Sequence, residues 1–155
     1  MAYAKPVASF ADIEDEFIER VHALVWCTAA TVDTRNRPRS RIWHPIWEGN
    51  VGRIATNRNT LKSKHLARNP YLSLSYLDHR DVWKPVYVDC RAEWDDTAEG
   101  KRRTWEMYVR APEPLGYDPA GIWGVVENPE FGVLMLRPWR VELVDGPGES
   151  RVWRA

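Results

Sequence analysis

Residues 39–70, RSRIWHPIWEGNVGRIATNRNTLKSKHLARNP, decide the fold. The first predicted strand carries Arg39 and Arg41, which the two-residue alternation of a strand places on one face. A Glu-Gly-Asn turn then leads into a second strand over residues 51–56. After it the chain turns into a short helix that carries Lys62. We therefore predict a strand, a tight turn, a strand and a short helix, in this order.

Cationic and hydroxyl groups gather where the second strand meets the helix. Arg41 comes from the first strand, Thr60 stands at the predicted start of the helix, and Lys62 follows two residues later. Free backbone N–H groups at a helix start, a hydroxyl and two cationic side chains are groups that bind phosphate. The alternative is a solvated strand end and a solvated helix. We favour the phosphate interpretation.

The composition limits the class of protein. The chain has 155 residues, and its 22 lysines and arginines equal its 22 aspartates and glutamates. We therefore expect no overall field that attracts nucleic acid or an acidic membrane surface. Hydrophobic residues make up 44% of the chain, which is typical of a packed globular protein. We expect residues 1–155 to form a single domain.

The cysteines indicate a reducing compartment. Cys27 and Cys90 lie in apolar, strand-like runs, outside any CxxC pair or Cys/His spacing typical of zinc. We expect both to be buried, reduced thiols. The first residues lack the apolar core of a signal peptide, and no run reaches the roughly 18 apolar residues of a membrane span. The predicted location is cytoplasmic, without membrane association.

The rest of the chain predicts further strands and a few short helices. Apolar residues at three- and four-residue steps predict a helix over residues 9–23, and the apolar run 24–32 predicts a strand buried on both faces. Later patterns predict strands at 71–77, 85–94 and 131–144, the last interrupted at Pro138, and a helix that ends at Arg110. Six to seven strands without strict β/α alternation imply an α+β or mainly β domain, an antiparallel β-barrel with flanking helices.

Residues 111–130 contain four prolines and three glycines, which exclude one long regular element. We predict an irregular loop, or a short helix around residues 122–126. The segment carries the aromatic residues Tyr117 and Trp123. A lid over a pocket and simple filling of the core are both open interpretations.

Three motifs, in order, carry a resemblance to a known family. They are Arg41-Ile42, then Ile54-Ala55-Thr56-Asn57 followed by Thr60-Leu61-Lys62, then RNPYLSL at residues 68–74. The ordered set resembles the pyridoxamine 5'-phosphate oxidase-like family of FMN-binding split β-barrels, and the similarity extends over residues 24–154. The resemblance implies a split β-barrel and an FMN cofactor.

The resemblance also implies roles for individual residues and for a second subunit. The implied cofactor-binding residues are Arg41, Thr60 and Lys62 at the phosphate, and the backbone of Ile42 and Trp43 with Ala55 and Thr56 at the isoalloxazine ring. Arg154 is similar to a basic residue in the family's C-terminal tail, which reaches the cofactor of the other subunit. A homodimer with the cofactor site at the subunit interface is therefore expected.

Three positions depart from the pattern of the pyridoxamine phosphate oxidases themselves. Ile46 stands where they have a lysine, Leu61 where they have a second basic residue, and Val144 where they have an aromatic residue. These departures argue against vitamin B6 oxidation and leave the flavin-type pocket. A related branch of the fold binds the deazaflavin coenzyme F-420, which the missing FMN ligands favour as an alternative cofactor.

The remaining side chains suggest no catalytic set of their own. No Ser/His/Asp or Cys/His arrangement is assignable, which fits flavin chemistry because the ring itself exchanges the hydride. We interpret His44 as structural and expect His65 on the exposed surface of its helix. Large aromatic side chains could form an apolar wall beside the ring or lie at the dimer contact; these candidates are Trp43, Trp47 and Trp123.

The leading hypothesis is an FMN-binding oxidoreductase that acts on a small planar or conjugated molecule. One alternative is a reductase that depends on the deazaflavin coenzyme F-420. Another is a non-catalytic protein that binds a flavin or haem on the same fold, with His44 as a candidate haem ligand.

Overall fold

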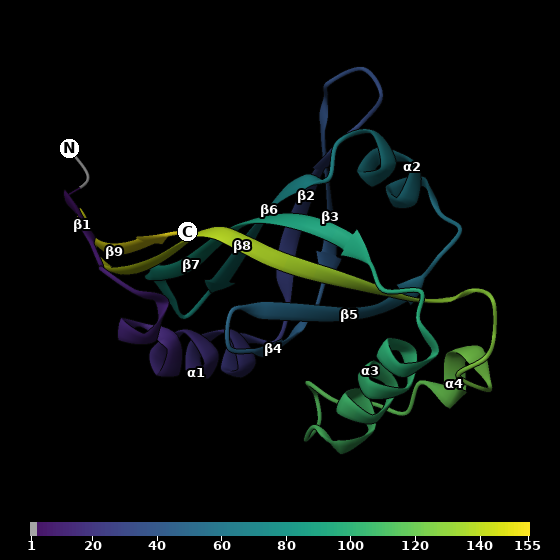
Figure 1. The fold of residues 1–155 in the computed structure, drawn as a ribbon. Coiled ribbons are helices and arrows are strands. Elements are labelled where there is room, and N and C mark those ends of the chain that lie inside the picture. The colour runs from purple at the N-terminus through teal and green to yellow at the C-terminus, as the bar shows by residue number, and fades with distance from the viewer. Residues whose placement is uncertain (1–2) are drawn as a thin grey trace.

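The computed structural model describes residues 3–155 (Figure 1). In chain order the elements are β1 (Tyr3–Pro6), a 3-10 turn (Phe10–Asp12), α1 (Glu14–Leu24), β2 (Cys27–Val32), β3 (Pro38–Trp43), β4 (Ile46–Glu48), β5 (Val51–Asn57), α2 (Leu61–Arg68), β6 (Tyr71–Asp78), β7 (Asp81–Trp94), α3 (Ala98–Arg110), α4 (Ala120–Trp123), β8 (Phe131–Gly146) and β9 (Glu149–Arg154).

The nine strands of the described residues form one sheet. Its order is β1-β9-β8-β7-β6-β2-β3, and β5 joins it by pairing with both β8 and β4. Neighbouring strands are antiparallel, except that β1 and β9 run parallel. The sheet curls without closing, with helices at its flanks (Figure 1). The predicted α+β split-barrel class is confirmed, and the short strands β1 and β4 raise the number of strands above the six to seven expected.

β8 is the strand that links the two halves of the barrel. Its first half pairs with β5, its second half pairs with β9, and β7 runs along both halves. The ladder with β7 shifts register beside Pro138, which pairs with Cys90 while Arg140 pairs with Asp89. A proline has no N–H to donate to a ladder, so a bulge at this position has a simple physical cause. β8 itself runs without a break from Phe131 to Gly146, so the interruption predicted at Pro138 is present only as this shift of register.

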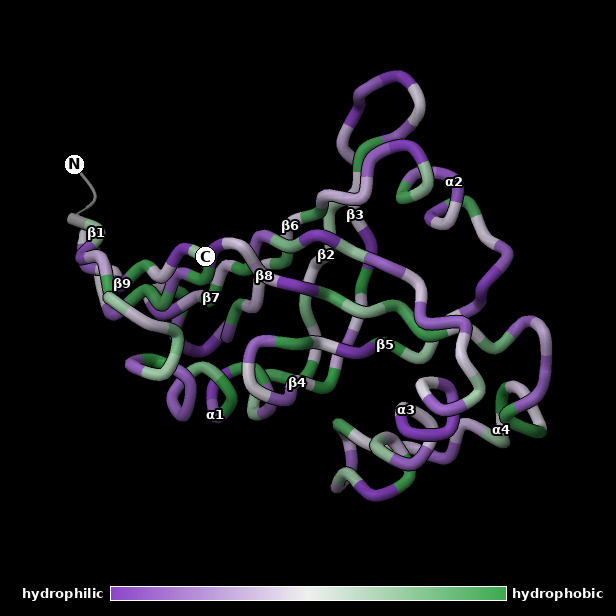
Figure 2. Tube along the Cα trace, viewed as in Figure 1, coloured by the Kyte–Doolittle hydropathy of each residue, from purple (hydrophilic) through white to green (hydrophobic). Residues whose placement is uncertain are grey.

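The core lies inside the curled sheet and is closed at one end by α1 (Figure 1). Phe17 and Val21 of α1 are fully buried in it. Alternate side chains of β7 face the core: Val86, Val88, Cys90 and Ala92. Figure 2 shows the same alternation of hydropathy along the strands. Cys27 and Cys90 are buried free thiols, which confirms that expectation.

One predicted strand needs correction. The run 24–32 was expected to be a strand buried on both faces, but Leu24 ends α1 and β2 begins only at Cys27. Within β2, Cys27, Ala29 and Thr31 are buried while the side chains between them are more open. An apolar run does not distinguish the end of a helix from the start of a strand, which explains the error.

The segment that opened the sequence analysis follows the predicted order, except that the first predicted strand is divided into β3 and β4, which pair with β2 and β5 respectively. Pro45 separates β3 from β4, and Gly49 makes the tight turn with a φ of 56°, which favours glycine. β5 and α2 follow, and Asn69 caps the C-terminus of α2 before Pro70. The segment therefore brings one edge strand, β3, and the start of α2 to the same end of the barrel.

Helices α3 and α4 lie on the other side of β5 from α2 (Figure 1). Thr97 caps α3, because its hydroxyl accepts the Gly100 N–H at 3.0 Å. The proline-rich segment 111–130 is largely irregular and contains only the short helix α4. None of the helices in residues 3–155 has the length and apolar character that crossing a membrane requires.

Candidate functional site

Three secondary-structure elements build the predicted phosphate corner. Arg41 of β3 is partly buried and donates from Nη1 to the hydroxyl of Thr31 in β2, at 2.6 Å. Lys62 in the first turn of α2 is also partly buried, and its Nζ donates to Thr60 Oγ1 at 3.1 Å. Sequence reasoning had selected Arg41, Thr60 and Lys62. The structure gathers all three at the start of α2.

Positive charge in this corner is not neutralised by the protein. Within residues 3–155, no carboxylate lies within 4.0 Å of the charged groups of Arg41 or Lys62. Burial, and then the nearby Arg41, lower the pKa of Lys62. Burial, and then the nearby Arg39, lower the pKa of Arg41. Like charges held together without a counter-ion are the arrangement that an anionic ligand stabilises.

A buried histidine stands behind Arg41. His65 is 2% exposed, so the expectation of an exposed position on the helix is wrong. Its Nδ1 lies 3.0 Å from Thr31 Oγ1, the same oxygen that accepts from Arg41. Two tautomers fit this contact: the Thr31 hydroxyl donates to an unprotonated Nδ1, or a protonated Nδ1 donates to the second lone pair of the hydroxyl oxygen. Burial, followed by repulsion from Arg41, lowers the pKa of His65, in keeping with a neutral ring.

A cavity of about 490 Å³ lies on the α3–α4 side of β5. It is lined by Trp26, His44, Ala55, Thr56, Asn57, Pro114, Tyr117, Ile122 and Trp123. These residues come from four separate parts of the chain, and none of them carries a formal charge when His44 is neutral. Burial lowers the pKa of His44, which favours the neutral imidazole. The cavity thus offers a largely aromatic, uncharged wall.

The cavity and the corner are neighbours through the connection between β5 and α2. Thr56 and Asn57 line the cavity, and Thr60 caps α2 only a few residues later. Arg41 of the corner also lies only three residues before His44, which lines the cavity. Three residues of extended chain span about 10 Å. A phosphate held in the corner can therefore carry a planar group that extends towards the cavity.

The residues expected at the ring divide between two surfaces. Ala55 and Thr56 line the cavity as expected. Ile42 points outward and is 63% exposed, whereas the Trp43 side chain is buried in the barrel core, so only its backbone can border a ligand. Trp47 is 2% exposed and donates from Nε1 to Tyr76 at 2.9 Å, which excludes it from an apolar wall beside the ring. Of the three tryptophan candidates, Trp123 alone lines the cavity.

His44 has a buried nitrogen without a partner. Its Nε2 is inaccessible to solvent and makes no hydrogen bond within the described residues. The imidazole contacts the rings of Trp26, Tyr108 and Tyr117, with centroid separations of 4.4, 5.5 and 5.5 Å. Sequence reasoning interpreted His44 as structural, because a lone histidine in a strand shows no partner. A buried polar atom left unsatisfied is uncommon in folded proteins.

Comparison with protein-family models and with curated proteins gives no match. Solved structures do match. A protein from Clostridium acetobutylicum related to general stress protein 26, of the pyridoxinephosphate oxidase family, is 12% identical with a TM-score of 0.74, over 95% of this chain and 96% of that one. A pyridoxamine 5'-phosphate oxidase-related, FMN-binding protein from Nostoc punctiforme is 16% identical with a TM-score of 0.63, over 88% and 84%. An F420 reductase is 18% identical with a TM-score of 0.61, over 82% and 94%.

This chain has the pyridoxamine 5'-phosphate oxidase-like fold. The resemblance stated from three sequence motifs is thereby confirmed at the level of the fold. With identities below 20%, these similarities establish architecture and leave the ligand to the residues of this chain.

Two departures from the oxidase pattern are visible in the structure. Ile46 is buried among apolar residues beside Tyr108, and Leu61 is 54% exposed on a shallow groove on the surface of α2. Neither position supplies positive charge. Arg41 and Lys62 remain as the neighbouring cationic side chains of the corner.

Within one chain, Arg154 lies apart from this corner. It is exposed on β9, and four strands, β8, β7, β6 and β2, separate β9 from β3 in the sheet. One chain therefore does not bring Arg154 to Arg41. Its expected role at a cofactor depends on a second subunit.

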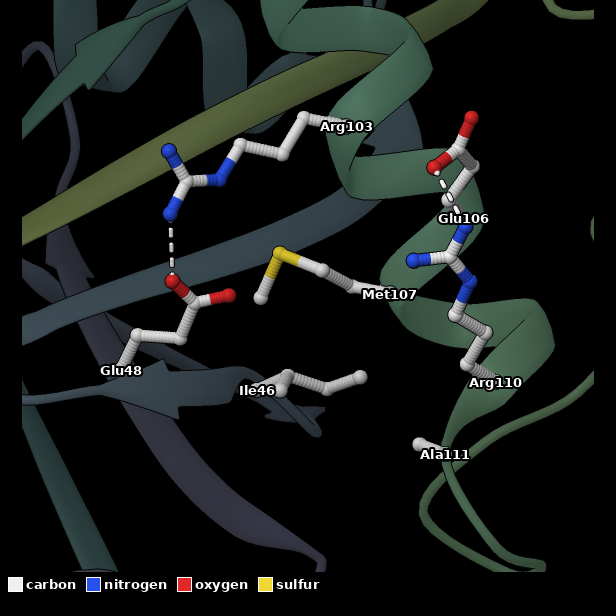
Figure 3. Close-up of a pocket in the computed structure, with 7 residues that line it drawn as sticks. All are labelled: Ile46, Glu48, Arg103, Glu106, Met107, Arg110 and Ala111. Carbon is white, nitrogen blue, oxygen red and sulfur yellow. Dashed lines mark hydrogen bonds and ion pairs between the residues drawn. The ribbon is translucent and has the colours of Figure 1, made fainter.

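A further groove, of about 420 Å³, lies between β4 and α3 (Figure 3). Its charged side chains are paired: Arg103 donates to Glu48, and Arg110 contacts Glu106 at 3.1 Å. Met107 and Ile46 lie between the two pairs (Figure 3). Because each of these cations already has a carboxylate, this groove lacks the unneutralised charge of the corner.

Proposed function

We propose that this protein is an FMN-binding oxidoreductase that acts on a small planar molecule. The observation that carries the proposal is the pair formed by Arg41 and Lys62. Both are partly buried, neither has a carboxylate partner among residues 3–155, and an aromatic cavity begins nearby. A phosphate ester of a planar redox cofactor satisfies both features at once.

The phosphate would be held by charge-assisted hydrogen bonds from Arg41 and Lys62 and by the hydroxyl of Thr60. Thr31 and His65 fix the guanidinium of Arg41 from behind, so less side-chain freedom is lost when the anion binds. Ala55 and Thr56 would border the planar ring at the cavity. When bound, the flavin supplies the capacity to take up and release a hydride. The chain's part is to position the ring and to keep water away from it.

A homodimer completes this proposal. The outward face of the sheet carries Ile42, Thr28, Ser75 and Tyr87 directly opposite one another across β3, β2, β6 and β7. Ile42 and Tyr87 are 63% and 37% exposed, and Tyr71 and Trp139 border a groove further along the same face. Apolar groups in such numbers on one open face favour contact with a second copy of the chain. Such a contact would give Arg154 of one protomer access to the cofactor of its partner.

The deazaflavin coenzyme F-420 is the second candidate cofactor. An F420 reductase shares the fold, and Leu61 removes a basic residue that FMN-dependent oxidases use. The coenzyme also carries a phosphate, so Arg41 and Lys62 would serve it in the same way. A protein of this type would be a reductase that draws its hydride from the deazaflavin.

The absorbance spectrum of the purified protein tests the proposal. Titration with FMN, and separately with coenzyme F-420, should give saturable binding of one of them, with a perturbed absorption band. Reduction of a dye by the complex should then show turnover. A tight complex without turnover would favour the non-catalytic flavin or haem binder. Binding of neither coenzyme removes the oxidoreductase hypothesis.

A further inference from the structure

The junction between α1 and β2 contains a strained backbone turn. Val25 has a φ of 65° and a ψ of −61°, and Asn36 is the only other residue in 3–155, apart from glycines, with a positive φ. Asparagine tolerates this region, whereas a β-branched residue is strained in it. Across Val25 the N–H of Trp26 donates to the carbonyl of Leu24 at 2.7 Å, which makes a γ-turn of the rare positive-φ kind. The surrounding structure must therefore stabilise Val25 in this turn.

Burial of the Val25 side chain stabilises the turn. The side chain is 4% exposed and belongs to a buried cluster that includes Ile46, Ala55 and Tyr108. The N–H of Val25 also donates to a carbonyl in the last turns of α1, at 2.9 Å. Only Val25 and Trp26 lie between α1 and β2. With Val25 anchored in the core, the turn directs Trp26 outward.

Trp26 is presented at the aromatic cavity. Its side chain is 51% exposed and lines the cavity beside His44, with ring centroids 4.4 Å apart. Among the described residues, the indole N–H groups that make hydrogen bonds belong to Trp47 and Trp123, so no such bond fixes Trp26. The position of the Trp26 ring is therefore set mainly by the backbone turn at Val25.

A second turn of the same geometry adjoins the other tryptophan of the cavity. Gly124 has a φ of 75° and a ψ of −63°, and the N–H of Val125 donates to the carbonyl of Trp123 at 2.9 Å. Glycine adopts this conformation without strain. Trp123 is also fixed by the hydrogen bond from its indole N–H to Asn57, at 2.9 Å.

The two turns differ in what must hold the tryptophan. Where the indole of Trp123 is fastened by a hydrogen bond, the turn is made with an unstrained glycine. Where the turn itself has to place Trp26, the chain uses a strained valine with a buried side chain. Strained backbone conformations concentrate at ligand sites, where they hold a group in one position before the ligand arrives.

We propose that Trp26 is a stacking residue for the planar ring of the ligand, and that Val25 is the positioning residue that presents it. The inference rests on the proposed function for the identity of that ring, the isoalloxazine. Ala55 lines the same cavity and packs in the same cluster as Val25. One buried cluster therefore sets both the strand that borders the ring and the turn that carries its aromatic contact. The uncharged face of Trp26 complements a flat conjugated ring, because stacking exchanges water for ring contacts.

Substitution of Trp26 tests the contact. Lumiflavin is the flavin ring without the ribityl phosphate, so its binding reports on the ring alone. Trp26→Leu should weaken FMN and lumiflavin about tenfold each, and Trp26→Phe, which keeps a ring, should stay within about threefold of the wild type. Flavin fluorescence measures both affinities, and the quenching that a neighbouring indole causes in the bound flavin should be reduced in Trp26→Leu. Trp83→Leu is the matched control, because Trp83 is 59% exposed and does not line the cavity.

A double-mutant cycle tests the role of Val25. Val25→Gly keeps the positive φ accessible and removes the anchor, so the turn is no longer fixed. We expect it to weaken lumiflavin several-fold in the wild-type background and to have no further effect in the Trp26→Leu background. Equal losses in both backgrounds would show that Val25 acts through the core and Ala55, and would overturn its positioning role. Val25→Ala, which shortens the anchor, serves in the same cycle if Val25→Gly does not fold.

The outcomes separate this inference from the proposed function. Unchanged affinity of Trp26→Leu for FMN and lumiflavin would overturn the stacking role while the flavoprotein proposal stands. If Trp26→Leu weakens lumiflavin as expected, but the wild type shows no preference for FMN over lumiflavin, the stacking role survives and the phosphate corner at Arg41 and Lys62 falls. A wild-type protein that binds neither FMN nor lumiflavin would overturn this inference and the FMN proposal together.

Discussion

Replacement of Lys62 by methionine should separate ligand binding from stability. Methionine keeps the length of the side chain and removes its charge. Lys62 makes one side-chain hydrogen bond within the described residues, to Thr60 at 3.1 Å, and burial, followed by repulsion from Arg41, lowers its pKa. The free protein therefore gains little from the charge. We expect the unfolding free energy of Lys62→Met to remain within about 0.5 kcal/mol of the wild-type value, or to rise.

The cofactor should respond in the opposite direction. A hydrogen bond between a charged donor and a phosphate contributes about 1.5–3 kcal/mol. At about 1.4 kcal/mol for each factor of ten, the Kd for FMN should rise by roughly ten- to over a hundredfold. Titration followed by flavin fluorescence measures the Kd, and urea unfolding of the free protein measures its stability.

Lys64→Met is the matched control. Lys64 lies on the same helix and is exposed, and it makes no side-chain hydrogen bond or ion pair within the described residues. Its removal should leave the affinity for FMN unchanged. Wild-type affinity in Lys62→Met, or a loss of several kcal/mol of stability in the free protein, would refute the reasoning, because Lys62 would then be a structural residue.

Three further predictions concern the support of the site. Thr31→Val removes the hydroxyl that fixes Arg41 and should weaken FMN binding several-fold, measured by the same titration, with a folded protein as judged by circular dichroism. Burial lowers the pKa of His65, so as the pH falls the unfolded chain binds a proton at this residue before the folded protein does. The unfolding free energy should therefore fall as the pH drops below about 6.5, by up to about 1.4 kcal/mol per pH unit. Urea unfolding at pH 7.5 and 5.5 measures this loss, which should be smaller in His65→Gln than in the wild type. Ser75→Arg places a charge on the outward sheet face and should give a monomer by light scattering, with weaker FMN binding; an unchanged dimer would place the contact elsewhere.

Local patterns in the sequence were sufficient for the strands and helix around the corner. The turn at Gly49, the break at Pro45 and the end of α2 before Pro70 each follow from the conformational limits of one residue. Because these limits are local, the order of elements could be predicted without a structure, apart from the division of the first strand into β3 and β4. The resemblance to the split β-barrel family over residues 24–154 then predicted the barrel itself.

Non-local contacts are what the sequence did not reveal. β1 exists because it pairs in parallel with β9, more than 140 residues later, and Tyr3–Pro6 alone shows no strand pattern. His65 is buried because Thr31 lies behind it, and that partner is 34 residues away. A polar residue on a short helix gives no signal of such a partner, so exposure was the expectation.

The cavity was missed for the same reason. Trp26, His44, Tyr117 and Trp123 meet only once the barrel is formed and the segment 111–130 is fastened to β5. Each of these residues, taken singly, is as easily explained by core packing. Only the unpartnered nitrogen of His44 distinguishes the arrangement from an ordinary aromatic cluster, and that observation requires coordinates.

The comparison of FMN with riboflavin tests the central claim most directly, because the two ligands differ only in the phosphate. Wild-type protein should bind FMN at least tenfold more tightly than riboflavin. In the double variant Arg41→Ala/Lys62→Met this difference should vanish, while the weak binding of riboflavin remains. An equal preference for FMN in wild type and double variant would contradict the assignment of the phosphate to this corner.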